Sequence, residues 1–564
     1  MGRMARTVGI GIQSFEAMIQ NNYYYVDKTK FIKEWWENGD AVTLITRPRR
    51  FGKTLTMDMV RRFFSVEYAG KGEVFEGLSI WEEKKYRQLQ GTYPVIFLSF
   101  ADVKETSFAG VKEKICILIK DLYNRYDFLR TEGILKEGEL EYFNLVSLEM
   151  SDTVAAHSLK ALSHYLARYY GKKVIILLDE YDTPLQEAYI GGYWEELTGF
   201  IRGLFNAAFK TNPDLDRAIM TGITRVSKES IFSDLNNLEV VTTTSEKYET
   251  CFGFTQEEVW KSLREYDLLE QKQSVQDWYD GFTFGKREDI YNPWSIINYL
   301  DKRKFSAYWA NTSSNRLVGK LIQEGDRDIK IAMEDLLKGE SLQVGMDEQI
   351  VFDQLGKKEN AIWSLLLASG YLKVKSYTFD FIRGRNIYEL SLTNYEVRIM
   401  FGEMIEGWFS EKRTAYNDFI KALLMDDVEA MNHYMNQVAM KTFSYFDTGK
   451  GALEEAEPER FYHGFVLGLM VELAGRYVIT SNRESGFGRY DVMLEPQERK
   501  DPAIILEFKV YNPRREKTLE DTVKAALKQI EEKKYGEALE ARGICPERIR
   551  RYGFAFEGKN VRIG

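Results

Sequence analysis

The sequence is poor in the residues that build disulfide frameworks and zinc sites. Its 564 residues include only three cysteines and four histidines. Cys116, Cys251 and Cys545 lie far apart along the chain, which excludes a disulfide scaffold and a Cys/His zinc cluster. Such sparing use of cysteine is typical of a reducing compartment, so we expect a cytoplasmic protein.

The sequence also lacks long apolar segments and an excess of positive charge. No run of about 18 apolar residues predicts a membrane-spanning helix, and the first residues contain no uninterrupted apolar stretch typical of a signal peptide. We therefore expect no membrane association. The 77 basic and 86 acidic side chains give a formal net charge of −9. This balance argues against a protein that coats nucleic acid, but it permits a local basic groove.

What the chain does contain is material for several hydrophobic cores, since 44% of its residues are hydrophobic and 14% are aromatic. Its length favours about two to four domains. Short apolar segments at residues 94–100, 174–178 and 217–223 predict the buried strands of a parallel sheet. Segments 109–126 and 154–170 predict helices between them.

The most informative segment is VTLITRPRRFGKTLT, at residues 42–56. An apolar strand leads into a basic turn, then into Gly52, Lys53 and Thr54, and then into a predicted helix at residues 57–64. Glycine lets the backbone approach a phosphate, and the helix N-terminus binds the anion. Lys53 reaches the β- and γ-phosphates, and the Thr54 hydroxyl ligates Mg²⁺. The segment therefore predicts a nucleotide-binding phosphate loop.

One position departs from the usual pattern of such a loop. A glycine is expected five residues before Gly52, and Arg47 stands there. On this segment alone, a basic turn that merely joins a strand to a helix remains an alternative.

A second motif follows at residues 174–180, where the apolar run VIILL ends in Asp179 and Glu180. Both carboxylates are thereby placed at the C-terminal tip of a buried strand, where open α/β sheets bind ligands. Asp179 is placed to hold Mg²⁺, and Glu180 to orient or deprotonate the attacking water. The alternative is a strand that simply ends in a polar turn. The residues expected to bind nucleotide are Arg49, Arg50, Phe51, Gly52, Lys53, Thr54, Leu55 and Asp179.

A fourth predicted strand, at residues 217–223, ends in Thr224 and Arg225. Arg225 can stabilise the charge that develops during phosphoryl transfer, in its own subunit or across an interface. Action across an interface requires a homo-oligomer. A solvated arginine at the end of a strand is an equally open interpretation.

The blocks RPRRFGKTL, LLDEYDTPL and TGITRVSKESIFSDLNNL together resemble the AAA-ATPase-like family of bacterial proteins, a divergent branch of the P-loop ATPases. The likeness includes YVDKTKFI, WYDGFTFG, YNPWSI and YWANTSSN and covers roughly residues 5–315. Loops of this family begin with Arg-Pro-Arg-Arg, so the resemblance accounts for Arg47. It implies a parallel-sheet ATPase core that uses ATP and Mg²⁺.

The middle of the chain, residues 316–446, contains no recognisable chemistry. Predicted helices at residues 329–337 and 361–367 and strands at residues 371–377 and 386–392 favour a winged-helix-like module. Such a module can bind DNA, but beside an ATPase it more commonly serves as a lid or spacer. The segment LTNYEV, at residues 392–397, resembles another block of the same family.

Near the C-terminus, the apolar strand AIILEFKV places Glu507 and Lys509 on one face and Phe508 on the other. Asp491, on the preceding strand, can meet them across the hairpin. Two carboxylates can then hold Mg²⁺, and Lys509 can position a water for attack on a phosphodiester. An exposed ion pair between Glu507 and Lys509 on an edge strand is the alternative.

This order of elements resembles the PD-(D/E)xK nuclease fold over about residues 455–558. The resemblance implies that Asp491, Glu507 and Lys509 are catalytic. Glu459 matches the acid of the first helix, and Gln529 lies on the helix that follows the motif. No proline precedes Asp491, where Tyr490 stands instead, but many members also lack it.

We therefore predict an α/β protein with a P-loop domain and helical lid, a middle region and a restriction-endonuclease-like α/β/α domain, at residues 1–315, 316–446 and 447–564. The predicted function is Mg²⁺-dependent cleavage of nucleic acid under the control of ATP, with DNA favoured over RNA. One alternative is an ATPase switch whose last domain binds nucleic acid or protein without cutting. Another is a protein that holds ATP as a structural ligand.

Overall fold

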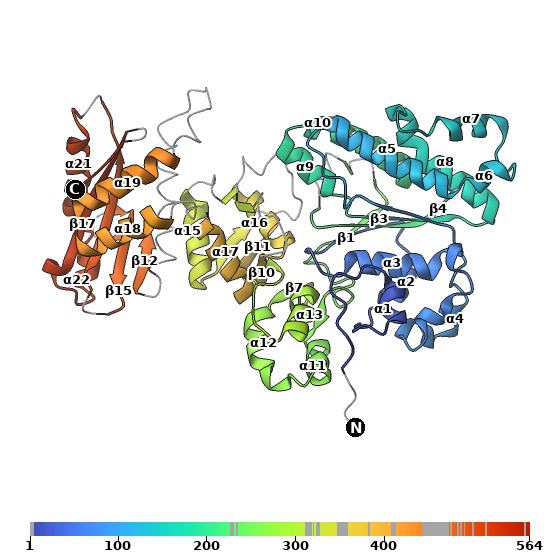
Figure 1. Cartoon of the computed structure of the whole chain (residues 1–564), viewed down its shortest axis with the longest axis horizontal. Coiled ribbons are helices and arrows are strands. Elements are labelled where there is room, and N and C mark those ends of the chain that lie inside the picture. Colours follow the sequence, from blue (N-terminus) through green and yellow to red (C-terminus); the bar gives the residue numbers. More distant parts are fainter. Residues whose placement is uncertain are drawn as a thin grey trace. The chain divides into compact units, whose positions relative to one another are not determined.

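The computed structural model describes residues 5–225, 231–232, 235–310, 318–319, 321–322, 327–346, 359–381, 384–407, 413–442, 473, 476–481, 484–485, 488–489, 491–498, 501–513, 516–557 and 560–564 (Figure 1). The chain divides into two compact units, which are described separately. The first comprises Met1–Ser314 and Ser341–Val397, and the second Asn315–Glu340 and Arg398–Gly564. No helix in the described part of the chain is long and apolar enough to cross a membrane.

The first unit is built on a parallel sheet of five strands in the order β2-β3-β4-β1-β5. Every residue of β1 and β3 is buried, which explains why β3 is apolar up to Asp179 and why β1 contains only apolar residues and threonine. Figure 1 shows α5, α8 and α10 on one face of the sheet and α1, α2 and α3 on the other. The strands are β1 (Val42–Thr46), β2 (Val95–Ser99), β3 (Val174–Asp179), β4 (Leu215–Gly222) and β5 (Leu238–Val241).

The predicted strands and helices of this sheet are confirmed, and so is the α/β class. Longer helices pack on the sheet, and short helices fill the connections between its strands. The helices are α1 (Phe15–Gln20), α2 (Lys30–Asn38), α3 (Lys53–Phe64), α4 (Lys84–Arg87), α5 (Phe108–Arg125), α6 (Phe128–Thr131), α7 (Glu137–Leu145), α8 (Asp152–Tyr170), α9 (Thr183–Gly191) and α10 (Trp194–Phe205).

A small aromatic-rich subdomain follows the sheet. Its helices α11 (Gln256–Glu265), α12 (Lys272–Tyr279) and α13 (Pro293–Lys302) enclose one hydrophobic cluster. The antiparallel strands β6 (Phe254–Thr255), β8 (Arg287–Tyr291) and β7 (Phe282–Phe284) form its sheet. The helical lid expected within residues 1–315 remains a prediction, and this subdomain is the part of the described chain that would form it.

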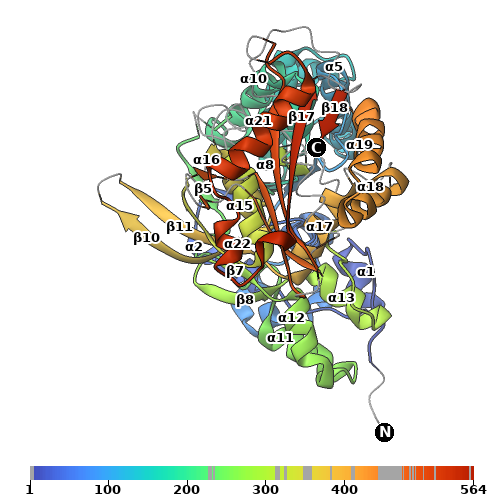
Figure 2. The ribbon, with the colours of Figure 1, turned by 90° about the vertical axis from the view of Figure 1, so that its left-hand side faces the viewer.

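The last part of the first unit consists of one helix and a three-stranded antiparallel sheet. The strands β9 (Leu342–Gly345), β10 (Leu372–Asp380) and β11 (Arg385–Leu392) pair in the order β10-β11-β9, and helix α16 (Glu359–Ala368) lies between β9 and β10 in the chain. Figure 2 shows the β10–β11 hairpin as a projecting two-stranded arm. The predicted helix and its two following strands are confirmed. Helix α17 (Tyr395–Gly407) comes directly after β11.

The second unit contains a five-stranded mixed sheet in the order β12-β15-β16-β17-β18, in which only β16 and β17 are parallel neighbours. Alternate residues of β16 face opposite hydrophobic clusters. Residues from α18 and α19 join the cluster that contains Phe508, and residues from α21 and α22 join the cluster that contains Ile505. The sheet is therefore covered by helices on both faces, which is an α/β/α arrangement.

The bounds of these elements show that helices before residue 446 contribute to this unit. The helices are α15 (Arg327–Lys338), α18 (Arg413–Met425), α19 (Val428–Thr442), α21 (Leu519–Glu532) and α22 (Glu537–Glu540). The strands are β12 (Tyr477–Ser481), β13 (Glu484–Ser485), β14 (Gly488–Arg489), β15 (Val492–Pro496), β16 (Ala503–Val510), β17 (Ile549–Glu557) and β18 (Asn560–Ile563). The boundaries proposed at residues 315 and 446 remain predictions.

Candidate nucleotide and nuclease sites

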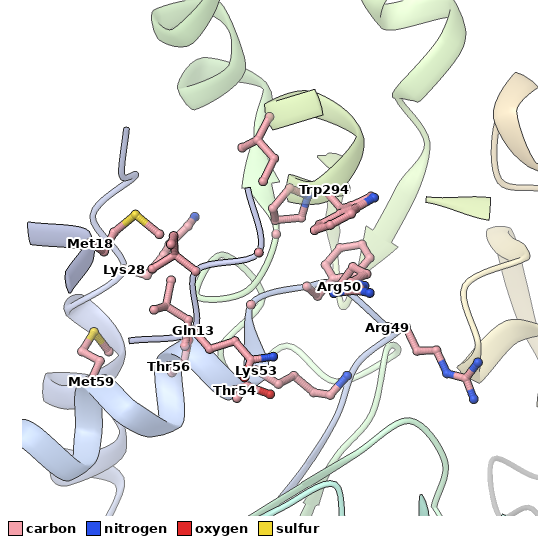
Figure 3. Close-up of a pocket in the computed structure, with 18 of the residues that line it drawn as sticks. Gln13, Met18, Lys28, Arg49, Arg50, Lys53, Thr54, Thr56, Met59 and Trp294 are labelled. Atoms are coloured by element: carbon pink, nitrogen blue, oxygen red, sulfur yellow. The ribbon is translucent and has the colours of Figure 1, made fainter. Parts of the chain in front are cut away.

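The predicted phosphate loop lies between the end of β1 and the first residue of α3. Gly52 precedes α3 with φ +81°, a conformation that side chains other than glycine rarely adopt. Arg50 also has a positive φ of +66°, and its guanidinium lies 4.3 Å from the centre of the Trp294 ring. Phe51 is buried against Phe282 and Phe284. These contacts fix the loop at Arg50 and Phe51, and Figure 3 shows Arg50 beside Trp294.

Arg47, at the start of the loop, is bound to neighbouring backbone carbonyl groups. Its side chain is completely buried, and its Nη1 donates to the carbonyl oxygens of Thr46, at 3.0 Å, and Thr242. The guanidinium also lies 4.5 Å from the centre of the Phe284 ring. Burial lowers the pKa of Arg47 to about 10. The side chain therefore packs into the domain core, which explains how arginine can stand where a glycine is usual.

Lys53 is the first residue of α3, and its ammonium group is buried. Nζ donates to the carbonyl oxygens of Arg47 and Pro48, both at 2.9 Å. Burial lowers the pKa of Lys53, and the nearby carboxylates of Glu180 and Asp182 oppose this shift. The lysine is thus directed back over the loop, where a bound phosphate would meet it.

Asp179 lies at the tip of β3 and is completely buried. One of its carboxylate oxygens accepts a hydrogen bond of 2.8 Å from the Thr54 hydroxyl, and the other accepts one from the Thr221 hydroxyl. Burial raises the pKa of Asp179, against the effect of these two donors. The strand order explains the contact, because β4 lies between β3 and β1 and carries Thr221 to the same edge.

Glu180 follows in a left-handed conformation, with φ +52°. Its backbone N–H donates to the Thr221 hydroxyl at 3.2 Å, and its carboxylate accepts from the Thr183 hydroxyl at 3.1 Å. Such backbone strain in a residue other than glycine is concentrated at functional sites. It turns the carboxylate toward the cavity that the loop borders.

That cavity has a volume of about 600 Å³ and lies within the first unit. Its lining combines polar and apolar groups. The polar groups include the loop, Lys53 and Thr54 at the start of α3, Lys28 and Glu180; Figure 3 shows Lys53 and Thr54 close together and Lys28 beside Met18. The apolar lining residues are Val8, Ile12, Met18, Val26, Met59 and Ile297. Arg49 and Leu55 also line the cavity.

The second constellation lies in the second unit, on β16 and α21. Glu507 is almost fully buried and accepts a hydrogen bond from the Gln529 side-chain amide. The Lys509 ammonium donates to the Gln529 oxygen at 2.6 Å. Asp491 accepts at 2.8 Å from the backbone N–H of Phe508, and its own N–H lies 3.4 Å from a Glu507 oxygen.

The strand register explains why these four side chains meet. Val492 pairs with Leu506, which places Asp491 beside Glu507. Glu507 and Lys509 alternate with Phe508 and therefore face α21. Gly553, opposite Glu507 on β17, allows the close approach of this helix, because a Cβ there would lie 2.7 Å from the carbonyl oxygen of Val523.

Comparison with known proteins finds a family match for the part of the chain that contains each candidate site. Residues 9–232 match the model of a family described as predicted AAA-ATPase, and residues 457–564 match the model of the PD-(D/E)XK nuclease superfamily. The chain joins an AAA-ATPase-like domain to a domain of the PD-(D/E)XK nuclease superfamily. Both resemblances noted in the sequence are thereby confirmed.

A relative from Azotobacter chroococcum mcd 1 is 25% identical over 398 residues. The match covers 70% of this chain and 69% of the relative, which is described as an uncharacterized protein in the vnfD 5' region. The similarity therefore extends beyond the AAA-ATPase-like segment alone.

Asp182 is a residue of the AAA-ATPase-like domain that sequence reasoning overlooked. It is buried, and one of its oxygens accepts from the N–H groups of Ile223 and Thr224, at 2.9 and 2.8 Å, and from the Thr224 hydroxyl at 2.8 Å. It thereby fixes the turn that leads to Arg225. The block LLDEYDTPL contained the signal, since it carries a third acid. Arg225 does not line the cavity, and its role remains a prediction.

Within the nuclease-superfamily domain, Glu459 lies outside the residues that the structure describes. In the described part of the chain, no cluster of three or more His, Cys, Asp or Glu side chains is arranged to hold a metal. Asp491 and Glu507 form a pair of carboxylates, and hard divalent cations commonly combine one or two carboxylates with water and substrate oxygens. The donor set therefore fits Mg²⁺.

Proposed function

We propose that the protein binds and hydrolyses ATP with Mg²⁺ in the cavity of the AAA-ATPase-like domain and cleaves nucleic acid at Glu507 and Lys509 under the control of ATP. The hydrogen bond between Thr54 and Asp179 carries the first part of this proposal. It brings a hydroxyl and a carboxylate together beside a loop that can bind phosphates, which is the pair expected to hold Mg²⁺.

In this proposal, the loop N–H groups and Lys53 bind the β- and γ-phosphates, and the apolar lining residues of the cavity contact the base. Lys53 leaves the carbonyl oxygens of Arg47 and Pro48 to contact a phosphate oxygen. Thr54 and Asp179 hold Mg²⁺, which offsets charge on the phosphates. Glu180 orients the attacking water and accepts its proton.

The chain of hydrogen bonds from Lys509 through Gln529 to Glu507 supports the nuclease assignment. It holds an ammonium beside a buried carboxylate in an apolar strand, an arrangement that is costly unless the charges are used or paired. Asp491 and Glu507 would hold Mg²⁺, which stabilises negative charge on a phosphodiester. Lys509 orients the water for attack. We favour DNA over RNA as the substrate.

The alternative function is an ATPase switch whose nuclease-like domain binds without cutting. The same hydrogen bonds favour it, because Gln529 already engages both Lys509 and Glu507. Catalysis requires Lys509 to bind the attacking water with another N–H of its ammonium group while Gln529 keeps the side chain oriented.

Cleavage of DNA and RNA by the full chain with Mg²⁺, in the presence and absence of ATP, tests both active sites. The matched variants are Lys509→Ala and Lys528→Ala, since Lys528 is an exposed residue of α21. We expect Lys509→Ala to abolish cleavage and Lys528→Ala to retain it. Cleavage that survives Lys509→Ala contradicts the nuclease assignment. Nucleic-acid binding without a metal and without cleavage supports the switch.

A further inference from the structure

Two sequence blocks that the proposed chemistry does not use meet at the phosphate loop. They are YWANTSSN, which contains Trp309, and LTNYEV, which contains Glu396. The indole Nε1 of Trp309 donates to the carbonyl oxygen of Arg49 at 3.0 Å. The side-chain amide of Asn292 donates to the same oxygen at 3.3 Å. Two side chains that follow β8 and α13 in the chain therefore hold one peptide group of the loop.

Trp309 is itself held by Glu396. The backbone N–H groups of Trp309 and Ala310 donate to one carboxylate oxygen of Glu396, at 2.5 and 3.4 Å. The hydroxyl of Ser295 donates to the other oxygen at 2.8 Å. Glu396 is completely buried, so these three donors are what allow its carboxyl group to lie in the core.

The segment before Glu396 also contacts the loop. Thr393 donates from its hydroxyl to the carbonyl oxygen of Gly370 at 2.7 Å. A Cβ at Gly370 would lie 2.7 Å from a ring carbon of Pro48, so the backbone of Gly370 closely approaches the Pro48 ring. The LTNYEV block is thus linked to two successive residues of the loop, to Pro48 through Gly370 and to Arg49 through Trp309.

Glu396 is the second residue of α17, and α17 is the helix in which the chain passes from the first unit to the second. The first unit ends at Val397, and the second resumes at Arg398. A change in the position of Glu396 therefore acts on the first turn of the helix that leads toward the nuclease-superfamily domain.

Nucleotide binding would change the loop at this point. Lys53 now donates to the carbonyl oxygens of Arg47 and Pro48, which are adjacent to the peptide group that Trp309 holds. A phosphate competes for the same ammonium, so its arrival removes a donor from both carbonyls. The loop must then adjust beside Arg49.

We propose that Trp309 and Glu396 act as a clamp that transmits the nucleotide state of the phosphate loop to α17. Both are positioning residues, and neither touches the phosphates. The inference rests on the proposed nucleotide site, and it gives that site a route of regulation to the rest of the chain. The route runs from Lys53 through the Arg49 carbonyl, Trp309 and Glu396 to the first turn of α17.

The test is amide hydrogen exchange of residues 395–407 in the full chain, with and without the β,γ-imido analogue of ATP and Mg²⁺. Nucleotide affinity is measured separately by titration, and exchange is compared at saturation. The variants are Trp309→Phe, Glu396→Ala and Glu396→Gln. Trp260→Phe is the control, because Trp260 packs against Tyr291 in the aromatic-rich subdomain and does not line the cavity.

We expect nucleotide to change the exchange rates of α17 by about fivefold or more in the wild type and in Trp260→Phe. Trp309→Phe removes the indole N–H, so affinity falls by about three- to tenfold and the response of α17 is lost. Glu396→Gln keeps an oxygen that can accept from the N–H groups of Trp309 and Ala310, and its amide nitrogen can donate to the Ser295 hydroxyl, which then accepts. We expect this variant to restore the response that Glu396→Ala loses. This rescue distinguishes transmission from a general loss of structure.

Other outcomes overturn the clamp. If nucleotide binds and α17 responds equally in the wild type and in Trp309→Phe, the clamp is wrong while the nucleotide site stands. If nucleotide binds and α17 does not respond in the wild type, the clamp is wrong as well. If no nucleotide binds to the wild type, the proposed ATPase function fails, and the clamp fails with it.

Discussion

The hydroxyl of Thr54 donates to the carboxylate of Asp179 at 2.8 Å, although 125 residues separate them in the sequence. The contact joins the N-terminus of α3 to the tip of β3, and Thr221 holds the second carboxylate oxygen. Both oxygens of this buried carboxylate are therefore oriented before a ligand binds. Preorganised polar groups of this kind stabilise a transition state with little reorganisation.

From the Thr54–Asp179 contact we predict that substitution of Thr54 changes the Mg²⁺ dependence of ATP turnover. Thr54→Ala removes a hydroxyl that we propose as a ligand of Mg²⁺, so we expect ATP turnover to fall by about 10- to 100-fold. Thr54→Ser keeps the hydroxyl and should retain most of the activity. Phosphate release measured over a range of Mg²⁺ concentrations checks this. Equal Mg²⁺ dependence in the wild type and Thr54→Ala contradicts the assignment.

A substitution at Glu180 is expected to affect ATP hydrolysis without affecting ATP binding. Glu180→Gln keeps the size of the side chain but removes the proton acceptor, so we expect turnover to fall by about 10²- to 10⁴-fold with ATP affinity retained. Equilibrium binding of ATP and phosphate release measure the two quantities. Glu195→Gln, on the exposed face of α10, is the control. Unchanged turnover in Glu180→Gln shows that Glu180 is not the base.

Loss of the Gln529 side chain is expected to slow cleavage of nucleic acid, because Gln529 orients Lys509. Its side chain contacts both Lys509 and Glu507, so Gln529→Ala frees the ammonium and leaves the carboxylate without its amide donor. We expect cleavage to fall by about 10- to 100-fold, as is usual when a partner that orients a site residue is removed. Lys528→Ala again serves as the neighbouring control on α21. Cleavage at the wild-type rate in Gln529→Ala contradicts an orienting role.

Glu396 predicts a pH-dependent stability. Burial raises its pKa from the ordinary value of 4.5 to about 7, against the effect of its three donors. Between these values the folded protein keeps the proton and the unfolded chain has lost it. The free energy of unfolding therefore falls as pH rises through this window, by up to about 3 kcal/mol.

Glu396→Gln removes this titration and should flatten the profile. Urea midpoints at pH 5 and pH 8 measure the change, and we expect the variant to gain stability relative to the wild type at pH 8. Glu403→Gln, at an exposed position of α17, should leave the profile of the wild type unchanged. A wild-type midpoint that rises from pH 5 to pH 8 as fast as, or faster than, that of the variant contradicts the raised pKa.

The sequence alone predicted the α/β class, the strands that carry Asp179 and Glu507, and the membership of both domains. These features are local. A glycine before a lysine at the start of a helix, or an acid at the end of an apolar run, takes its geometry from the chain within about ten residues. The faces of β16 followed from the same reasoning, because side chains alternate along every strand.

The tertiary structure decided which distant groups meet. The sequence could not show that Arg47 is buried under Phe284, that Gln529 bridges Lys509 and Glu507, or that Trp309 and Glu396 hold the phosphate loop. Nor did it predict that α18 and α19 cover one face of the second sheet. The order of strands and the packing of helices set these contacts, and both depend on the whole core, not on local spacing.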